Sequence, residues 1–112
     1  MKNDLKYLLH IMESIVLIDR FLEGFSKTEF NNNVEKQFAV VRGLEIIGEA
    51  VKNLSSSFRK KYPQITWRDI AGTRDILIHA YFSVDVGLVW DIVKKDLPSL
   101  KEKIKEIIQK EN

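Results

Sequence analysis

A chain of 112 residues fits one domain of common size, here 1–112, and such a chain can bury roughly two thirds of its unfolded surface. Charged residues make up 30% of it, yet the net charge is only +2, which argues against a strongly basic protein that wraps nucleic acid. Cysteine is absent, which excludes disulfides and thiolate metal sites and fits a reducing cytoplasm. Charged residues interrupt the first apolar run, so we expect no signal peptide, no membrane span and a cytoplasmic protein.

The first predicted element is an amphipathic helix over residues 4–23, in which large apolar residues recur every three or four positions and Gly24 follows as a stop. Ser26 precedes Glu29 by three residues, which is the spacing of a capping box. The asparagine run 31–33 soon interrupts any helix that begins there, so we expect only a short helical turn.

A long second helix is predicted over residues 34–54, with Asn32 or Asn33 as its N-cap. Its expected apolar face comprises Phe38, Val41, Leu44, Ile47, Val51 and Leu54. Gly43 and Gly48 lie inside this helix, where each costs about 1 kcal/mol relative to alanine. We therefore expect both glycines to allow close approach of neighbouring helices.

The serine run 55–57 and the Tyr62–Pro63 pair predict a loop, which carries a basic cluster at residues 59–61. Thr66 and Asp69 mark the next helix start, and another helix should begin near Ser83 or Asp85. Pro98 should kink or interrupt the last helical stripe. Because no segment alternates with period two, the expected fold is an all-α bundle of four to five helices.

The segment 67–82 contains a stretch of eight residues that holds a cation, an imidazole and a phenol, namely Arg74, His79 and Tyr81. Arg74 can hold a phosphate through its planar fork, and His79, with an ordinary pKa of ~6.5, suits proton transfer near neutrality. Tyr81 could donate to a phosphate or stack on a base, and Asp75 could orient the imidazole of His79.

Helical geometry sets Arg74 and Tyr81 on one face but rotates His79 about 140° from Arg74. One straight helix therefore cannot direct all three side chains at one substrate atom. Either the helix unwinds near His79, or two protomers of a symmetric dimer each contribute part of the site.

Structural roles compete with these functional interpretations. A histidine at a helix end is often a structural or surface group, and Trp67, Phe82 and Trp90 suit a core better than a base-stacking platform. For Arg42, Glu45 and Glu49, which lie on one stripe of the second helix, internal ion pairing is favoured over a role beside Arg74. Four further basic residues are either a solvated surface or RNA phosphate contacts: Arg59, Lys60, Lys61 and Arg68. Two isolated histidines without cysteine form no zinc pattern, so we expect neither a metal site nor a cofactor.

The spacing Arg74, four residues, His79, one residue, Tyr81 resembles the Arg-(four to six)-His-x-Tyr signature of HepT-like toxins in the HEPN superfamily. Four surrounding runs are also similar to that family: GLEIIGEA from Gly43, WRDIAGTRD from Trp67, IHAYF from Ile78 and VWDIVKKDLPSLKEKI from Val89. The likeness spans nearly the whole chain, with no departure at a motif position.

The resemblance implies an antiparallel up-down helical bundle that forms a homodimer, with the two motifs facing one cleft. It also implies a metal-independent endoribonuclease toxin with RNA as substrate, neutralised by a small antitoxin with a nucleotidyltransferase fold. Some such antitoxins adenylylate the motif tyrosine, here Tyr81, and the added bulk and negative charge would keep RNA from Arg74 and His79.

The corresponding mechanism is attack by an RNA 2′-hydroxyl on the adjacent phosphorus, with His79 as general acid or base and Arg74 stabilising the transition state. The alternative is a non-catalytic helical module that binds a nucleotide or a partner protein through the same cleft. A third possibility is that Tyr81 matters mainly as the acceptor of a modification.

Overall fold

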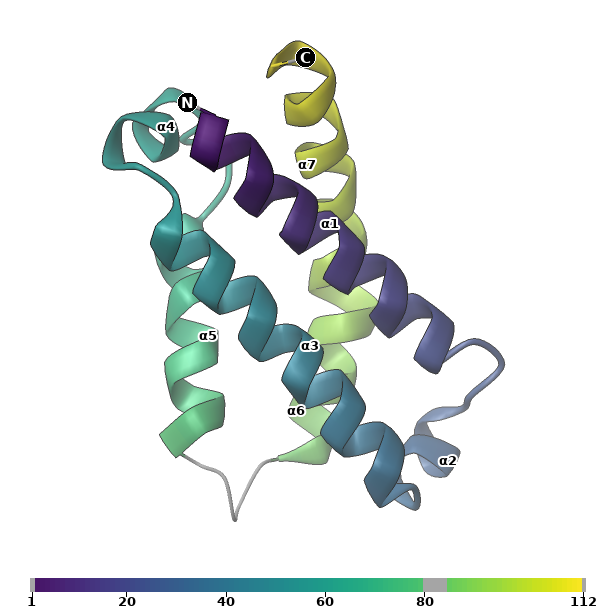
Figure 1. The fold of residues 1–112 in the computed structure, drawn as a ribbon. Helices are drawn as coiled ribbons and strands as arrows, with labels where there is room; N and C mark the ends of the chain where they lie inside the picture. The colour runs from purple at the N-terminus through teal and green to yellow at the C-terminus, as the bar shows by residue number, and fades with distance from the viewer. Residues whose placement is uncertain (1, 80–84, 112) are drawn as a thin grey trace.

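Four long helical rods run alternately up and down (Figure 1). The computed structural model describes residues 2–79 and 85–111. Three rods are single helices, namely α1 (Lys2–Phe21), α3 (Val34–Asn53) and α5 (Trp67–His79). The fourth combines α6 (Val86–Asp91), the π-helical segment η1 (Ile92–Asp96) and α7 (Leu97–Glu111). The short helices α2 (Lys27–Asn31) and α4 (Ser56–Lys61) lie in the connections.

The all-α prediction is confirmed, because no β-strand occurs among residues 2–79 and 85–111. These residues form seven α-helices and one π-helical segment, more than the four to five helices expected. The difference arises from the two short connecting helices and from the division of the last rod. No helix within the described ranges is both long and apolar enough to cross a membrane.

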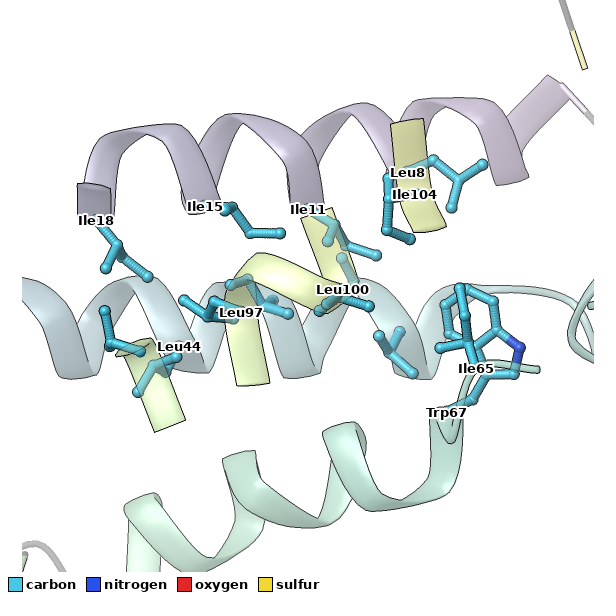
Figure 2. Close-up of a cluster of buried hydrophobic side chains, with 14 of the residues drawn as sticks. Leu8, Ile11, Ile15, Ile18, Leu44, Ile65, Trp67, Leu97, Leu100 and Ile104 are labelled. Atoms are coloured by element: carbon cyan, nitrogen blue, oxygen red, sulfur yellow. The ribbon is translucent and has the colours of Figure 1, made fainter. Parts of the chain in front are cut away.

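The middle of the bundle is α3, which packs against α1 on one side and α5 on the other, while α7 packs against α1 (Figure 1). Side chains of α1, α3 and α7 interdigitate in the core shown in Figure 2, with Ile65 and Trp67 at one end. The labelled members are all buried: Leu8, Ile11, Ile15, Ile18, Leu44, Ile65, Trp67, Leu97, Leu100 and Ile104. Burial of these apolar groups, each contributing roughly 1.5–3 kcal/mol, is what holds the rods together.

Both glycines inside α3 stand at close contacts between helices, as predicted. A Cβ on Gly43 would lie 2.8 Å from side-chain atoms of Ile18 on α1. A Cβ on Gly48 would lie 2.2 Å from the Cβ of Arg74 on α5. Contacts this short do not occur between real carbon atoms, so α3 approaches both neighbours at positions that no other residue could occupy without a shift.

The predicted helix starts at α2 and α3 are confirmed. At α2, the Ser26 side chain accepts from the Glu29 N–H at 3.1 Å, and the Glu29 carboxylate accepts from the Ser26 N–H at 3.0 Å. At α3, the Asn33 side chain accepts from the Lys36 N–H at 2.9 Å. Each cap satisfies a backbone donor that the first turn of a helix leaves unpaired.

The loop predicted over the serine run is wrong, because residues 56–61 form α4 with Ser55 as its N-cap. Ser55 donates through its N–H and its hydroxyl to the two carboxylate oxygens of Asp4, at 2.7 and 2.8 Å. The Ser55 Oγ in turn accepts from the Phe58 N–H at 3.2 Å. A buried carboxylate from the start of α1 therefore fixes the beginning of α4, and the buried Phe58 ring anchors it.

The apolar face predicted for α3 is partly wrong. Phe38 is 57% exposed, whereas Val40 is fully buried in its place. Leu44, Ile47 and Val51 are buried as expected. The stripe thus begins at Val40 and follows the side of α3 between α1 and α5.

Pro98 interrupts the last rod as predicted, and the interruption takes the form of η1. The Leu97 N–H donates to the carbonyl of Ile92, five residues earlier, which is the π-helical pattern. Pro98 has no N–H to give to the Lys94 carbonyl, and its ring would collide with that carbonyl in a regular α-helix. The wider π turn just before the proline relieves both conflicts.

Substitution of Gly48 by alanine should test the contact between α3 and α5. The new Cβ would collide with Arg74, and such overpacking typically costs about 1–3 kcal/mol of the free energy of unfolding. Gly72→Ala on α5 is the matched control, since a Cβ there meets nothing within 4 Å. That control should gain up to about 1 kcal/mol from helix propensity. Urea unfolding of both variants measures the difference, and equal stability of the two would contradict the close contact.

Candidate active site on α5

The helix α5 is fixed at its start by buried groups. The carbonyl of Thr66 accepts from the N–H groups of Asp69 and Ile70, which begins the helix where the sequence predicts it. Trp67 is buried, and its indole N–H donates to the Tyr62 carbonyl at 3.0 Å. A satisfied, buried indole is a core group, so the prediction of a core role for Trp67 is confirmed.

Arg74 lies in the middle of α5, at the contact with α3. Its stem passes over Gly48, and 27% of its side chain is exposed. The guanidinium pairs through NH2 with the Glu49 carboxylate at 3.1 Å and through NH1 with the Asp75 carboxylate at 3.3 Å. A guanidinium has five donors, so these two contacts leave others for a substrate phosphate.

Asp75 extends this network to a second cation. Its Oδ1 accepts from the Lys52 Nζ at 2.6 Å, so cations and carboxylates alternate in the order Lys52, Asp75, Arg74, Glu49. The hydrogen bond from Lys52 lowers the pKa of Asp75 below its ordinary value, and Arg74 adds a smaller effect in the same direction. Asp75 is therefore ionised at neutral pH, where it remains an anionic partner for the Arg74 guanidinium.

Arg42, Glu45 and Glu49 of α3 do not form one internal ion-pair group, because Glu49 pairs with Arg74 of α5. Arg42 and Glu45 form an internal pair at 3.5 Å, as the structural interpretation expects. Glu49 instead reaches across to α5. Lys52 is the member of the network that sequence reasoning missed, and its place three residues after Glu49, on the same side of α3, is the signal that could have found it.

His79 is the last residue of α5, and the helix continues without a break from Arg74 to it. The helix therefore does not unwind between these two residues, and unwinding just after His79 stays a prediction because residues 80–84 lie outside the described residues. The backbone positions of Arg74 and His79 lie about 140° apart around the axis, which leaves the paired-protomer arrangement open. Tyr81 lies outside the described residues, as does the side chain of His79, so the predicted roles of both and of Asp75 as their support remain predictions.

Three of the four residues predicted to contact RNA phosphates lie together. Arg59, Lys60 and Arg68 line one open hollow of about 430 Å³ where α4 meets the start of α5. Ile65 and Trp67 also line it. We call this feature the basic hollow. It was predicted only as a run of charges, and the turn between the two helices is what brings Arg68 to the other two.

The fourth predicted phosphate residue, Lys61, lies elsewhere. Its Nζ pairs with the Glu111 carboxylate of α7 at 2.9 Å, and the Tyr62 hydroxyl donates to the same carboxylate oxygen. The hydrogen bond from Lys61, followed by that from Tyr62, lowers the pKa of Glu111, and the bond to Glu111 raises the pKa of Tyr62. Lys61 thus joins α4 to the end of the last rod.

Comparison of the sequence with models of protein families shows which family the chain belongs to. The model of the family described as Ribonuclease HepT-like matches residues 11–107. The chain belongs to this HepT-like family. The match includes all of α3 and α5 and therefore the whole ion-pair network around Arg74.

HepT-like relatives share most of the chain's length. The chain is 48% identical over 101 residues to a Thermococcus cleftensis protein named "Probable ribonuclease HepT", covering 90% of this chain and 92% of that protein. It is 43% identical over 111 residues to a Caldanaerobacter subterraneus protein named as a putative RNase, covering 99% of each. No solved structure matches the chain.

A third relative is longer. A Methanocaldococcus jannaschii protein named as a gamma-glutamylcyclotransferase and putative RNase is 50% identical over 110 residues, which cover 97% of this chain and 50% of that protein. The HepT-like chain therefore spans half the length of this relative.

The described part of this HepT-like chain holds no group of three or more histidine, aspartate or glutamate side chains that could hold a metal ion. The arrangement around Arg74 offers a partly buried guanidinium held by two carboxylates. Such a cation can bind a phosphate oxygen and stabilise extra charge that develops on it.

Replacement of Glu111 by glutamine tests the junction between α4 and α7. Gln can still accept hydrogen bonds, so the change removes the charge alone. Because the folded pKa of Glu111 lies below its ordinary 4.5, the carboxylate stabilises the fold above that pH and loses this effect as pH falls through the folded pKa. The urea midpoint of Glu111→Gln should thus be lower than wild type at neutral pH and approach it in acid.

The matched control for that variant is Glu106→Gln, an exposed carboxylate of α7. Its midpoint should follow wild type at every pH. A pH-independent deficit in Glu111→Gln would show that the junction does not depend on the carboxylate charge.

Proposed function

We propose that this chain is an endoribonuclease toxin of a toxin–antitoxin pair, with Arg74 and His79 as its catalytic residues. The observation that carries the proposal is the sequence motif Arg74-(four)-His79-x-Tyr81, whose first residue lies on α5 with its guanidinium held between Glu49 and Asp75. Membership of the HepT-like family and the names of its relatives as ribonucleases support the same activity.

The reaction we propose is an internal transfer at one RNA phosphodiester. The 2′-hydroxyl oxygen forms a bond to the adjacent phosphorus as the bond from phosphorus to the 5′-oxygen breaks, which leaves a 2′,3′-cyclic phosphate or its hydrolysed form. His79 acts as general acid or base for the proton that leaves the 2′-hydroxyl or reaches the 5′-oxygen. Arg74 stabilises the charge that builds up on the phosphoryl oxygens.

The site is proposed to be composite, formed by two protomers of a homodimer. The unbroken α5 keeps Arg74 and His79 about 140° apart, so one protomer does not present both to one phosphate along one face. The motif of a second protomer, related by a two-fold axis, would bring its own Arg74 or His79 to the phosphate from the other side. Dimers of this symmetry are the commonest oligomers.

Regulation is proposed to act on Tyr81. A minimal nucleotidyltransferase-fold antitoxin would transfer an adenylyl group from ATP to its hydroxyl with release of pyrophosphate, placing a phosphodiester charge and a base beside the motif. That group would repel and exclude an RNA phosphate from Arg74.

One observation favours the non-catalytic alternative. Arg74 already has two carboxylate partners, which is also what a purely structural ion pair between α3 and α5 requires. A helical module that binds a nucleotide or a partner protein would then be the function. Cleavage measurements on the two motif variants distinguish the two functions.

His79→Ala and Arg74→Ala should each reduce cleavage of single-stranded RNA by a factor of about 10²–10⁴, the usual contribution of a general acid–base group or a charge-stabilising donor. The helical circular dichroism spectrum should stay unchanged in His79→Ala. Lys105→Ala, which removes an exposed cation of α7, is the control and should cleave at the wild-type rate. An unchanged rate in His79→Ala would overturn its assignment.

A second test measures RNA cleavage by the wild-type protein in the presence of a metal chelator. Cleavage should continue in the presence of EDTA, because the proposed chemistry uses a side-chain acid–base group and a guanidinium. Loss of cleavage with EDTA and its return on addition of magnesium would contradict the mechanism.

Co-expression with a neighbouring nucleotidyltransferase gene should add one or more nucleotide units to the chain, as intact-mass spectrometry measures. Tyr81→Phe lacks the acceptor hydroxyl and should keep its unmodified mass. A modified Tyr81→Phe chain would place the acceptor elsewhere.

A further inference from the structure

The basic hollow holds positive charge that no carboxylate of the described residues neutralises. Arg59, Lys60 and Arg68 make no ion pair within residues 2–79 and 85–111, and Asp69 is the acid that also lines the hollow. Three cations and one carboxylate leave a net charge of +2 there. By contrast, Lys61, directly next in the sequence, is paired with Glu111.

Arg59 lines the hollow with a guanidinium whose hydrogen-bonding groups the described residues leave partly unpaired. Its Nε is buried and has no hydrogen-bond partner, the sole such side-chain atom among the residues that the structure describes. An unsatisfied buried donor is rare in folded proteins and calls for an explanation. A partly desolvated guanidinium also attracts an anion more strongly than one in bulk water.

We propose that the basic hollow binds a backbone phosphate of the RNA substrate, at a distance from the phosphate that is cleaved. This inference rests on the proposed ribonuclease function for its choice of RNA. Arg68 precedes Arg74 by six residues, or roughly 9 Å along α5, compared with about 3.4 Å of rise per nucleotide in a stacked strand. The two sites are therefore far enough apart along α5 for each to contact a different phosphate of one strand.

The hollow recognises charge and not sequence. Its aromatic residue, Trp67, is buried and donates its indole N–H to Tyr62, so it offers no exposed ring on which a base could stack. Contacts that reach only phosphate position a nucleic acid without reading its bases.

The neighbouring hollow between α5 and the last rod is a weaker candidate. It measures about 390 Å³ and carries both signs of charge, with Asp69 and Asp96 beside Lys95 and Lys103. Its two carboxylates balance its two cations, so its charge does not favour a phosphate. The basic hollow is therefore the place to test.

The test measures RNA binding by full-length protein that carries His79→Ala, so that the strand stays intact. Lys60→Ala with Arg68→Ala removes two exposed cations of the hollow without touching the partly buried Arg59. Lys105→Ala with Lys110→Ala removes two exposed cations of α7 and makes the same change in net charge. Fluorescence anisotropy of a labelled single-stranded RNA at several salt concentrations gives the dissociation constants.

We expect the hollow variant to reduce the slope of log Kd against log salt by about 0.7, since each phosphate neutralised on a single strand contributes about 0.7 and the hollow is proposed to hold one phosphate. The loss of affinity should be similar for RNAs of different sequence, and the α7 variant should follow the His79→Ala parent. A hollow variant with the slope and affinity of the α7 variant overturns the proposal, as does RNA that fails to bind the parent.

Cleavage by proteins with His79 intact separates this inference from the proposed function. If wild type cleaves RNA and the hollow variant binds like the α7 variant, the phosphate site is refuted and the ribonuclease function stands. If wild type cleaves nothing while the salt slope still falls in the hollow variant, the ribonuclease function is refuted and the phosphate site stands.

Discussion

The close approach of α3 to its two neighbours is the constraint on which the bundle and the site both depend. Gly43 and Gly48 are five residues apart, so their missing side chains point about 140° apart, toward α1 and α5 respectively. With larger residues there, α3 would hold both neighbours further away and the core would open. The same contact at Gly48 supports the stem of Arg74, so packing and chemistry share one position.

The charges of the chain fall into two groups with different physical consequences. Most described ion pairs join separate helices: Lys52 and Glu49 of α3 meet α5, Lys61 meets α7, and Lys101 of α7 meets Asp19 of α1 at 3.3 Å. Exposed pairs of this kind contribute little stability, typically below about 1 kcal/mol. Their value here lies in orientation, because each holds a long side chain in one direction. Within residues 2–79 and 85–111, no ion pair holds the cations of the basic hollow in one direction.

Local signals predicted the parts of the fold that depend on a few neighbouring residues. The capping box at Ser26 and the N-cap at Asn33 involve partners three residues away, and both are visible in the sequence. The close contacts at Gly43 and Gly48 were also predictable, since a helix interior has little other use for glycine. For these features the spacing alone was sufficient.

Distant contacts were the source of the errors. Residues 56–61 were predicted as loop because the carboxylate that orients Ser55 belongs to Asp4, 51 positions earlier. The pairing of Arg74 with Glu49 and the gathering of Arg68 with the α4 cations likewise depend on how helices pack. The motif that begins at Arg74 was evident as a pattern, but the partners of Arg74 across the bundle could not be obtained from spacing.

The π-helical segment has a consequence for how the last rod keeps one side toward the core. Val89, Val93 and Leu97 are all buried although they are four residues apart, a step that turns about 40° too far on a regular α-helix. The wider turn of η1 absorbs that excess and returns the stripe to alignment before Leu100 and Ile104. The π-helical segment therefore changes the rotational register of the rod. Residues before and after η1 that share a face cannot be found by counting at a constant 3.6 residues per turn.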